Sequence, residues 1–139
     1  MTRVLIIDDE KAVREAAQIA LTAKGYDVVT VADGKSGLEV IKSGGVDVAI
    51  VDVFMPGMDG LAATDAIHRI NPKLPVIAMS GFMFGGQCPT MPYFDEMATE
   101  AGAVSALYKP FRPAELIQAI EKAVAPAPLS GLTDGAAQA

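Results

Sequence analysis

The chain has 139 residues, of which 51% are hydrophobic and 20% charged, and its formal net charge is −6. A chain of this size can bury a core as one domain without disulfides or a structural metal. The acidic balance argues against a direct nucleic-acid surface, because binding to phosphates needs clustered Lys and Arg.

Cysteine usage and apolar runs restrict the location of the protein. Cys88 is the only cysteine, so no internal disulfide can form, which is typical of a reducing compartment. No apolar run approaches the roughly 18 residues that a membrane helix needs. We therefore expect a cytoplasmic globular protein that contacts neither membranes nor nucleic acid.

Apolar runs and helical spacings alternate through the first half of the chain. Val4–Ile7 is expected to be a buried strand, and apolar residues at the i, i+3, i+4, i+7 spacing predict a helix after it. A second strand is predicted at Asp27–Val31, and Asp33 can cap the helix that follows. A pair of glycines ends that helix, and Val46–Val51 is the third predicted strand.

The second half repeats the pattern. Asp59 can cap a third helix, and Leu74–Met79 is the fourth predicted strand. A short helix is expected at Tyr93–Ala101, a fifth strand at Val104–Tyr108, and a last helix opens at Pro113.

Strict alternation of strands that are apolar on both faces predicts a parallel sheet covered by helices on each side. The fold class is therefore α/β, doubly wound, with a five-stranded sheet. We expect one domain over residues 1–125. Residues 126–139 are rich in Ala, Pro and Gly and lack periodicity, which predicts a flexible tail or linker.

Chemistry-bearing residues follow the predicted strands. Asp52 ends the third strand just before a Pro/Gly turn, Asp8 and Asp9 follow the first, and Ser80 and Lys109 follow the fourth and fifth. Ligands of open parallel sheets lie at the carboxyl ends of the strands. With strand order 2-1-3-4-5, all five residues would line one crevice.

These residue types suit Mg²⁺ and a phosphoryl group. Mg²⁺ prefers oxygen ligands, usually one or two carboxylates together with waters and a phosphate oxygen. A carboxylate can attack phosphorus, and the charge on the moving phosphoryl group must be met by fixed cations and donors. A single Asp at a strand end is more often a turn residue or helix cap. The joint placement of all five residues at strand ends favours the functional interpretation.

Over Thr2–Val124 the sequence resembles a two-component response-regulator receiver domain of the chemotaxis-regulator kind, which implies a flavodoxin-like fold. The resemblance makes Asp52 the phosphoacceptor, and Asp8 and Asp9 the acidic pair of an Mg²⁺ site. It adds the main-chain carbonyl of Phe54 as a further metal ligand.

The resemblance also implies how the protein signals. Ser80 would be the switch hydroxyl, and Lys109 the lysine that contacts the phosphoryl group. A histidine kinase or phosphotransfer protein would donate the phosphoryl group, and the altered surface would change which protein partner binds. The domain would be a switch that catalyses only its own phosphorylation and dephosphorylation, and we expect a stand-alone regulator. A receiver belonging to a longer regulator is the open alternative.

The first departure from the family pattern is at its switch aromatic, where this chain has Ala106. Tyr108 shares a strand face with Ala106 by alternation. One hypothesis is that Tyr108 takes over part of the switch role, and the alternative is that it only packs.

The connection after Ser80 is the second departure. Residues 81–91 form a longer loop than the family usually has, and Phe82 and Phe84 lie within it. Exposed apolar clusters often mark interaction sites, so residues 81–94 are predicted to be a partner or homodimer surface. The alternative is that they fold back onto the sheet edge.

Phe54 and Phe82 each lie two residues beyond a site residue, at positions that modulate dephosphorylation in the family. Bulky apolar groups there would hinder an attacking water, which leads to the hypothesis of a long-lived phosphoryl state.

Two rival functions remain open. A pseudo-receiver would use the fold only for binding, without phosphorylation. A phosphatase of the haloacid dehalogenase type would also use an aspartyl phosphate and Mg²⁺, but it has a second Asp two residues after the nucleophile, where this chain has Phe54. The phosphatase is the weaker rival.

Overall fold

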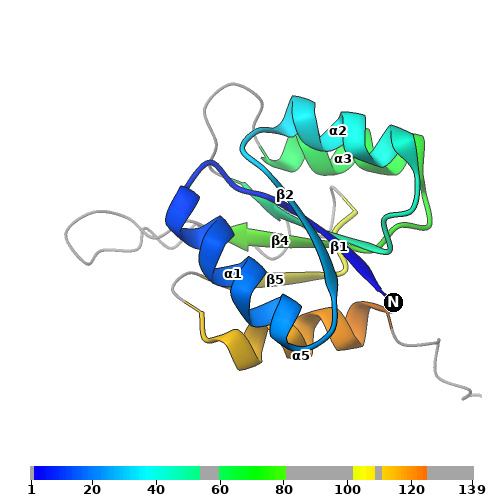
Figure 1. Ribbon diagram of the computed structural model, residues 1–139. Helices are drawn as coiled ribbons and strands as arrows, with labels where there is room; N and C mark the ends of the chain where they lie inside the picture. Colours follow the sequence, from blue (N-terminus) through cyan, green and yellow to red (C-terminus); the bar gives the residue numbers. More distant parts are fainter. Residues whose placement is uncertain (1, 54–59, 81–101, 109–110, 125–139) are drawn as a thin grey trace, which may run out of the picture.

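A computed structural model of the chain describes residues 2–53, 60–80, 102–108 and 111–124 (Figure 1). Strands and helices alternate along it. The elements are β1 Arg3–Ile7, α1 Lys11–Ala23, β2 Asp27–Val31, α2 Gly34–Ser43, β3 Val48–Asp52, α3 Gly60–Ile70, β4 Val76–Ser80, β5 Ser105–Tyr108 and α5 Pro113–Val124.

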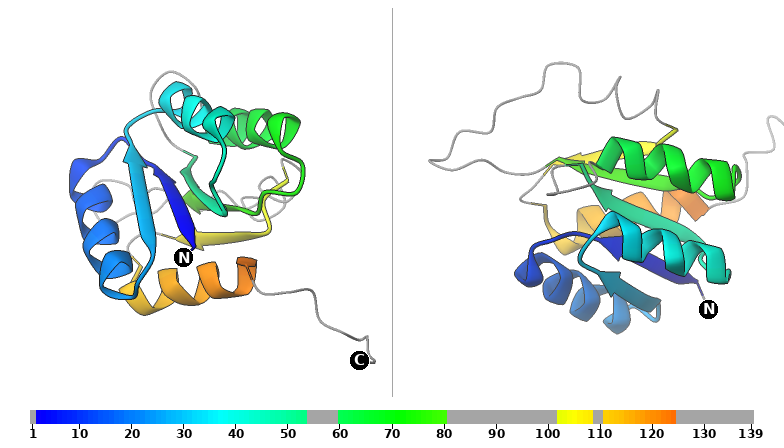
Figure 2. Two further views of the ribbon diagram at one scale, coloured as in Figure 1. Left: turned by 45° about the vertical axis from the view of Figure 1, so that its right-hand side comes forward. Right: turned by 90° about the horizontal axis from the view of Figure 1, so that it is seen from above.

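The strands form one five-stranded sheet in the order β2-β1-β3-β4-β5, and all neighbouring strands are parallel. Helices α1 and α5 cover one face of the sheet, and α2 and α3 cover the other (Figures 1 and 2). The predicted fold class and strand order are confirmed.

The core has two layers because the central strands are apolar on both faces. Ile6 of β1 and Ile50 of β3 pack with Leu116 of α5 on one side of the sheet. Leu5 of β1 packs with Ile67 of α3 on the other side. All five residues of β3 are buried, as expected for the middle strand of a parallel sheet.

Four predicted strands differ from the observed ones at a boundary. The first begins one residue earlier, at Arg3, and the fifth begins one residue later, at Ser105. The third begins at Val48, because the N–H of Asp47 donates to the carbonyl of Arg3 and the Asp47 carboxylate accepts from the N–H of Arg3. The fourth begins at Val76, because Leu74 closes a turn by donating to the carbonyl of Asn71. The third and fourth strands also end one residue later than predicted, at Asp52 and Ser80.

The predicted cap of the second helix is confirmed, since Asp33 Oδ1 accepts a 2.7 Å hydrogen bond from the N–H of Ser36. Several predictions lie outside the described residues: the cap at Asp59, the helix at 93–101, the loop at 81–91 and the tail at 126–139. Within the described ranges, no helix is long and apolar enough to cross a membrane.

Candidate metal and phosphoacceptor site

Asp8 and Asp52 lie at the carboxyl ends of neighbouring strands. Asp8 directly follows β1, and its N–H donates to the carbonyl of Val31 at the end of β2 at 3.1 Å. Asp52 is the last residue of β3, which pairs with both β1 and β4. Asp8 is fully buried and Asp52 is 2% exposed. Two carboxylates are thus buried next to an apolar core at this edge of the sheet.

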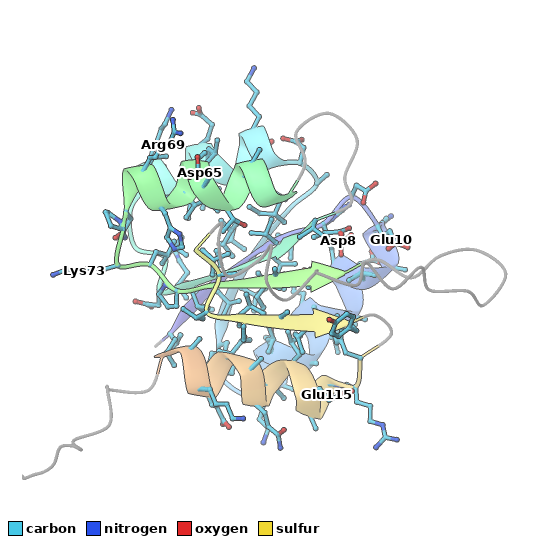
Figure 3. All side chains as sticks on the ribbon, turned by 180° about the vertical axis from the view of Figure 1, so that it is seen from behind. Asp8, Glu10, Asp65, Arg69, Lys73 and Glu115 are labelled. Atoms are coloured by element: carbon cyan, nitrogen blue, oxygen red, sulfur yellow. The ribbon has the colours of Figure 1, made fainter. Side chains whose placement is uncertain are left out.

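A third carboxylate joins them from the start of α1. Oxygens of Asp8, Glu10 and Asp52 all lie within 4.8 Å of one another. The N–H of Glu10 donates to Asp8 Oδ1 at 2.9 Å, which fixes the turn between β1 and α1. Figure 3 shows Asp8 and Glu10 at this end of the sheet. Among the described residues, these three make up the acidic cluster.

The acidic cluster differs from the predicted ligand set in one position. Asp9 is exposed and is not among the three clustered carboxylates. Sequence reasoning missed Glu10. The sequence did carry a signal for Glu10, because it is the third acid of the run that begins at Asp8. A tight turn can bring residues i and i+2 to the same side. The role of Asp9 as a ligand stays a prediction.

The donor set fits a small divalent cation. Carboxylate oxygens are the ligands that Mg²⁺ prefers. Two unit charges 4 Å apart near a protein surface repel each other by about 4 kcal/mol, so a cation between the clustered carboxylates would offset a substantial cost. Asp8 and Asp52 are the buried members of the cluster and could hold the ion most rigidly.

The two remaining strands end at the same edge of the sheet. Ser80 ends β4, and its register partner is Tyr108, the last residue of β5. The side chain of Ser80 lies outside the described part of the chain, and Lys109 lies just beyond the described part of β5. Phe54, together with Phe82 and Phe84, also lies outside the described residues.

Two residues of β5, Ala106 and Tyr108, lie at positions considered for the switch role, and their surroundings differ. Ala106 packs against the buried cluster of Val53, Ala78 and Ala103. Tyr108 is 46% exposed. The exposure leaves its ring in reach of a binding partner, and the proposed switch role stays a prediction.

Comparison with known protein families decides the identity of the fold. A model of the response regulator receiver domain matches residues 4–121 of this chain. The chain belongs to the response regulator receiver domain family. Receiver domains are signalling modules that work with histidine kinases and downstream effectors. The phosphatase alternative is therefore set aside.

Curated relatives are longer than this receiver domain. The chain is similar to the transcriptional regulatory protein CseB of Streptomyces avermitilis, with 35% identity over 119 residues that cover 86% of this chain and 47% of CseB. It is also 35% identical to GlrR of Escherichia coli over 121 residues, 87% of this chain and 26% of GlrR. The chain thus spans about half, or less, of the curated relatives it matches.

Solved receiver structures share the fold. Chemotaxis protein CheY4 of Vibrio cholerae superposes with a TM-score of 0.79 at 29% identity, covering 88% of this chain and 98% of CheY4. The response regulator TrrA of Thermotoga maritima, determined in complex with Mg²⁺-BeF, has a TM-score of 0.75 at 28% identity over 88% and 98% of the two chains. These likenesses extend across nearly the whole receiver fold.

Proposed function

We propose that this receiver domain accepts a phosphoryl group on Asp52 and thereby switches its protein contacts. The observation that carries the proposal is the position of Asp52 at the end of β3, where its carboxylate lies in the acidic cluster and is 2% exposed. Asp8, Asp52 and the main-chain carbonyl of Phe54 would hold Mg²⁺, with Asp9 and Glu10 beside them. The complex of TrrA with Mg²⁺-BeF supports this assignment by similarity.

In the proposed reaction the phosphoryl group moves directly from the donor protein to Asp52, and no further reactant is needed. A carboxylate oxygen of Asp52 forms a bond to phosphorus, while the bond from phosphorus to an imidazole nitrogen of the donor breaks. Lys109 would place its ammonium on the phosphoryl oxygens, and the Ser80 hydroxyl would donate a hydrogen bond to them. Mg²⁺ bound at the site supplies the positive charge that offsets the charge of the transferring group.

The partners of the switch are proteins in this proposal. A histidine kinase or phosphotransfer protein donates the phosphoryl group in the cytoplasm, and a downstream protein or a second copy binds residues 81–94. Tyr108 contributes to the switch surface, because it ends β5 opposite Ser80 and is exposed. The acidic charge of −6 supports a protein partner over direct contact of this chain with nucleic acid.

The test is phosphorylation by acetyl phosphate with Mg²⁺, measured by intact mass. The parent protein should gain the mass of one phosphoryl group, and chelation of Mg²⁺ should abolish the gain. Asp52→Asn should gain nothing, whereas Asp65→Asn on the exposed side of α3 should behave like the parent. An unmodified parent would instead favour a binding module that works without phosphorylation.

The lifetime of the phosphoryl group follows from the same proposal. Phe54 and Phe82 follow Asp52 and Ser80 by two residues in the sequence. Bulky apolar groups at these positions would hinder an attacking water, so decay should be slow. Mass measured over time after removal of the donor gives the lifetime, and Phe82→Asn should shorten it. Rapid decay in the parent would contradict this part of the proposal.

A further inference from the structure

Arg14 ties the start of α1 to the loop that carries the acidic cluster. Its Nη1 donates a 2.8 Å hydrogen bond to the main-chain carbonyl of Asp8, and the side chain is half-buried. The N–H of Arg14 also donates to the carbonyl of Glu10 at 3.1 Å. The second of these bonds is the ordinary i to i−4 bond of a helix, so the contact specific to the Arg14 side chain is the one to the main chain of Asp8, a member of the acidic cluster.

The first turn of α1 breaks the usual charge preference of helices. Acids are favoured near a helix N-terminus, and a cation there typically costs about 0.3–1 kcal/mol. The first turn of α1 contains no acid, Glu10 at its N-cap makes no side-chain cap bond, and Lys11 and Arg14 are basic. In α5, by contrast, Glu115 occupies the first turn and accepts from the N–H of Arg112 at 2.8 Å.

Departures from local preference of this kind are expected where a site imposes its own demands. The site next to this helix terminus is the acidic cluster of Asp8, Glu10 and Asp52. A guanidinium is well suited to holding the loop of this cluster, because its planar fork of N–H donors bonds a carbonyl oxygen in a fixed direction.

We propose that Arg14 is a positioning residue for the metal site, one that acts through the main chain of Asp8. The bond holds the β1–α1 link so that the carboxylates of Asp8 and Glu10 stay beside Asp52 before the cation arrives. The inference rests on the proposed function, since it takes the acidic cluster to bind Mg²⁺.

A role of Arg14 through its charge and a role in positioning the loop predict opposite effects of its removal on cation affinity. If Arg14 acted only by its charge, its loss would strengthen cation binding, because a repelling cation would be gone. If it positions the loop, its loss would weaken binding. Lys11 separates the two, because it carries the same charge in the same turn and pairs with Glu15 at 3.9 Å instead of bonding the loop.

The experiment measures Mn²⁺ binding in the unphosphorylated full chain by electron paramagnetic resonance of free Mn²⁺, with Mg²⁺ as competitor. Loss of groups that orient metal ligands typically lowers metal affinity by roughly 10–100-fold, and we expect about tenfold for Arg14→Met. Arg14→Lys should also weaken binding, because a single ammonium lacks the fork. Lys11→Met should bind as tightly as the parent or slightly more tightly.

A second readout uses phosphorylation by acetyl phosphate. Arg14→Met should raise the Mg²⁺ concentration needed for half-maximal rate and leave the rate at saturating Mg²⁺ close to that of the parent. Urea unfolding in EDTA checks that each variant folds. Should Arg14→Met fail to fold, Arg14→Lys decides alone, and parental Mn²⁺ affinity in it contradicts the inference.

Asp52→Asn distinguishes failure of the inference from failure of the proposed function. If the parent binds no Mn²⁺, or Asp52→Asn binds as tightly as the parent, the acidic cluster is not the metal site and both ideas are wrong. If Asp52→Asn loses binding while Arg14→Met keeps parental or tighter affinity, only the role of Arg14 is wrong.

Discussion

Carboxylate oxygens of Asp8 and Asp52 lie within 4.8 Å of each other, although the two residues lie at the ends of different strands, and both are almost completely buried. Parallel pairing of β1 with β3 brings the two strand ends together. A buried pair of like charges is costly unless a counter-charge is bound. If the acidic cluster binds Mg²⁺ as proposed, the stability of the domain should therefore depend on the cation.

Asp8→Asn should therefore stabilise the metal-free protein and remove its response to Mg²⁺. The amide oxygen can still accept from the N–H of Glu10, so the turn is kept while one charge is lost. We expect a gain of about 1 kcal/mol in EDTA, a fraction of the roughly 4 kcal/mol of repulsion between close unit charges. In the parent, Mg²⁺ at ten times its Kd should add about 1.4 kcal/mol.

Urea unfolding with and without Mg²⁺ measures both effects, with the exposed Glu39→Gln as a charge-matched control. A parent protein whose unfolding midpoint ignores Mg²⁺, or an Asp8→Asn variant that still responds to it, would count against the assignment.

Gly37→Ala should destabilise the domain because α2 lies very close to β1. A Cβ at Gly37 would lie 2.8 Å from Cγ1 of Ile7 and would also overlap its Cδ1. Ala gains about 1 kcal/mol in helix propensity, but overpacking costs about 1–3 kcal/mol, so we expect a net loss of about 1 kcal/mol. Chemical denaturation measures it. Adding Ile7→Val, which removes the δ carbon, should recover part of the loss, and strict additivity of the two changes would refute the close contact.

Gly102→Ala should be more costly, because two effects add. Gly102 has φ +107°, and a Cβ there would overlap the ring of His68. The backbone contribution is about 1–2 kcal/mol and the overlap about 1–3 kcal/mol, so the expected loss is roughly 2–5 kcal/mol. His68 is packed as well as hydrogen-bonded, with Nε2 3.0 Å from the carbonyl oxygen of Leu74.

Gly25→Ala is the matched control, since Gly25 has φ +92° and a methyl group added there would meet no atom within 4 Å. It should show the backbone cost alone. His68→Ala combined with Gly102→Ala should relieve only the overlap. Equal losses in Gly25→Ala and Gly102→Ala would show that the His68 contact carries no energy.

Asp33 should make stability depend on pH at the acidic end. The hydrogen bond from the N–H of Ser36 lowers the pKa of Asp33 below its ordinary value. Because the folded pKa is depressed, the stabilisation is present above the unfolded pKa of about 3.9 and is lost as pH falls through the folded value.

Urea unfolding across this pH range should show Asp33→Ala less stable than the parent at neutral pH, with the difference shrinking below about pH 4. Asp33→Asn keeps a neutral cap, so the difference in its free energy of unfolding from that of Asp33→Ala should not change with pH. A parent-to-alanine difference that is constant down to acid pH would exclude a titrating cap.

Patterns that depend on burial and local chemistry can be predicted from the sequence. The second strand has its predicted bounds, Asp27–Val31, and Asp33 is the predicted cap. The third strand begins at Val48, although the apolar pattern predicts Val46. Val46 packs against the core without pairing in the sheet. An apolar pattern reports burial and cannot separate it from strand pairing.

The composition of the acidic cluster shows a second limit. Sequence spacing places Asp8 and Asp52 at one edge, and they lie there, but it does not show that Glu10 joins them. The position of Glu10 depends on the turn closed by Asp8 Oδ1 and on the bond from Arg14, which are contacts between atoms and leave no periodic signal. The roles of Ser80 and Lys109 remain predictions.

Phosphorylation at Asp52 is tested most directly by locating the phosphorylated residue chemically. The parent protein is treated with acetyl phosphate and Mg²⁺ and then reduced with borohydride, which converts an aspartyl phosphate to homoserine, and the peptides are mapped by mass spectrometry. We predict homoserine at position 52 alone, and none when Mg²⁺ is chelated. Reduction at Asp8 or Asp9, or at Glu10, or no reduced residue at all, would contradict the assignment of Asp52 as the phosphoacceptor.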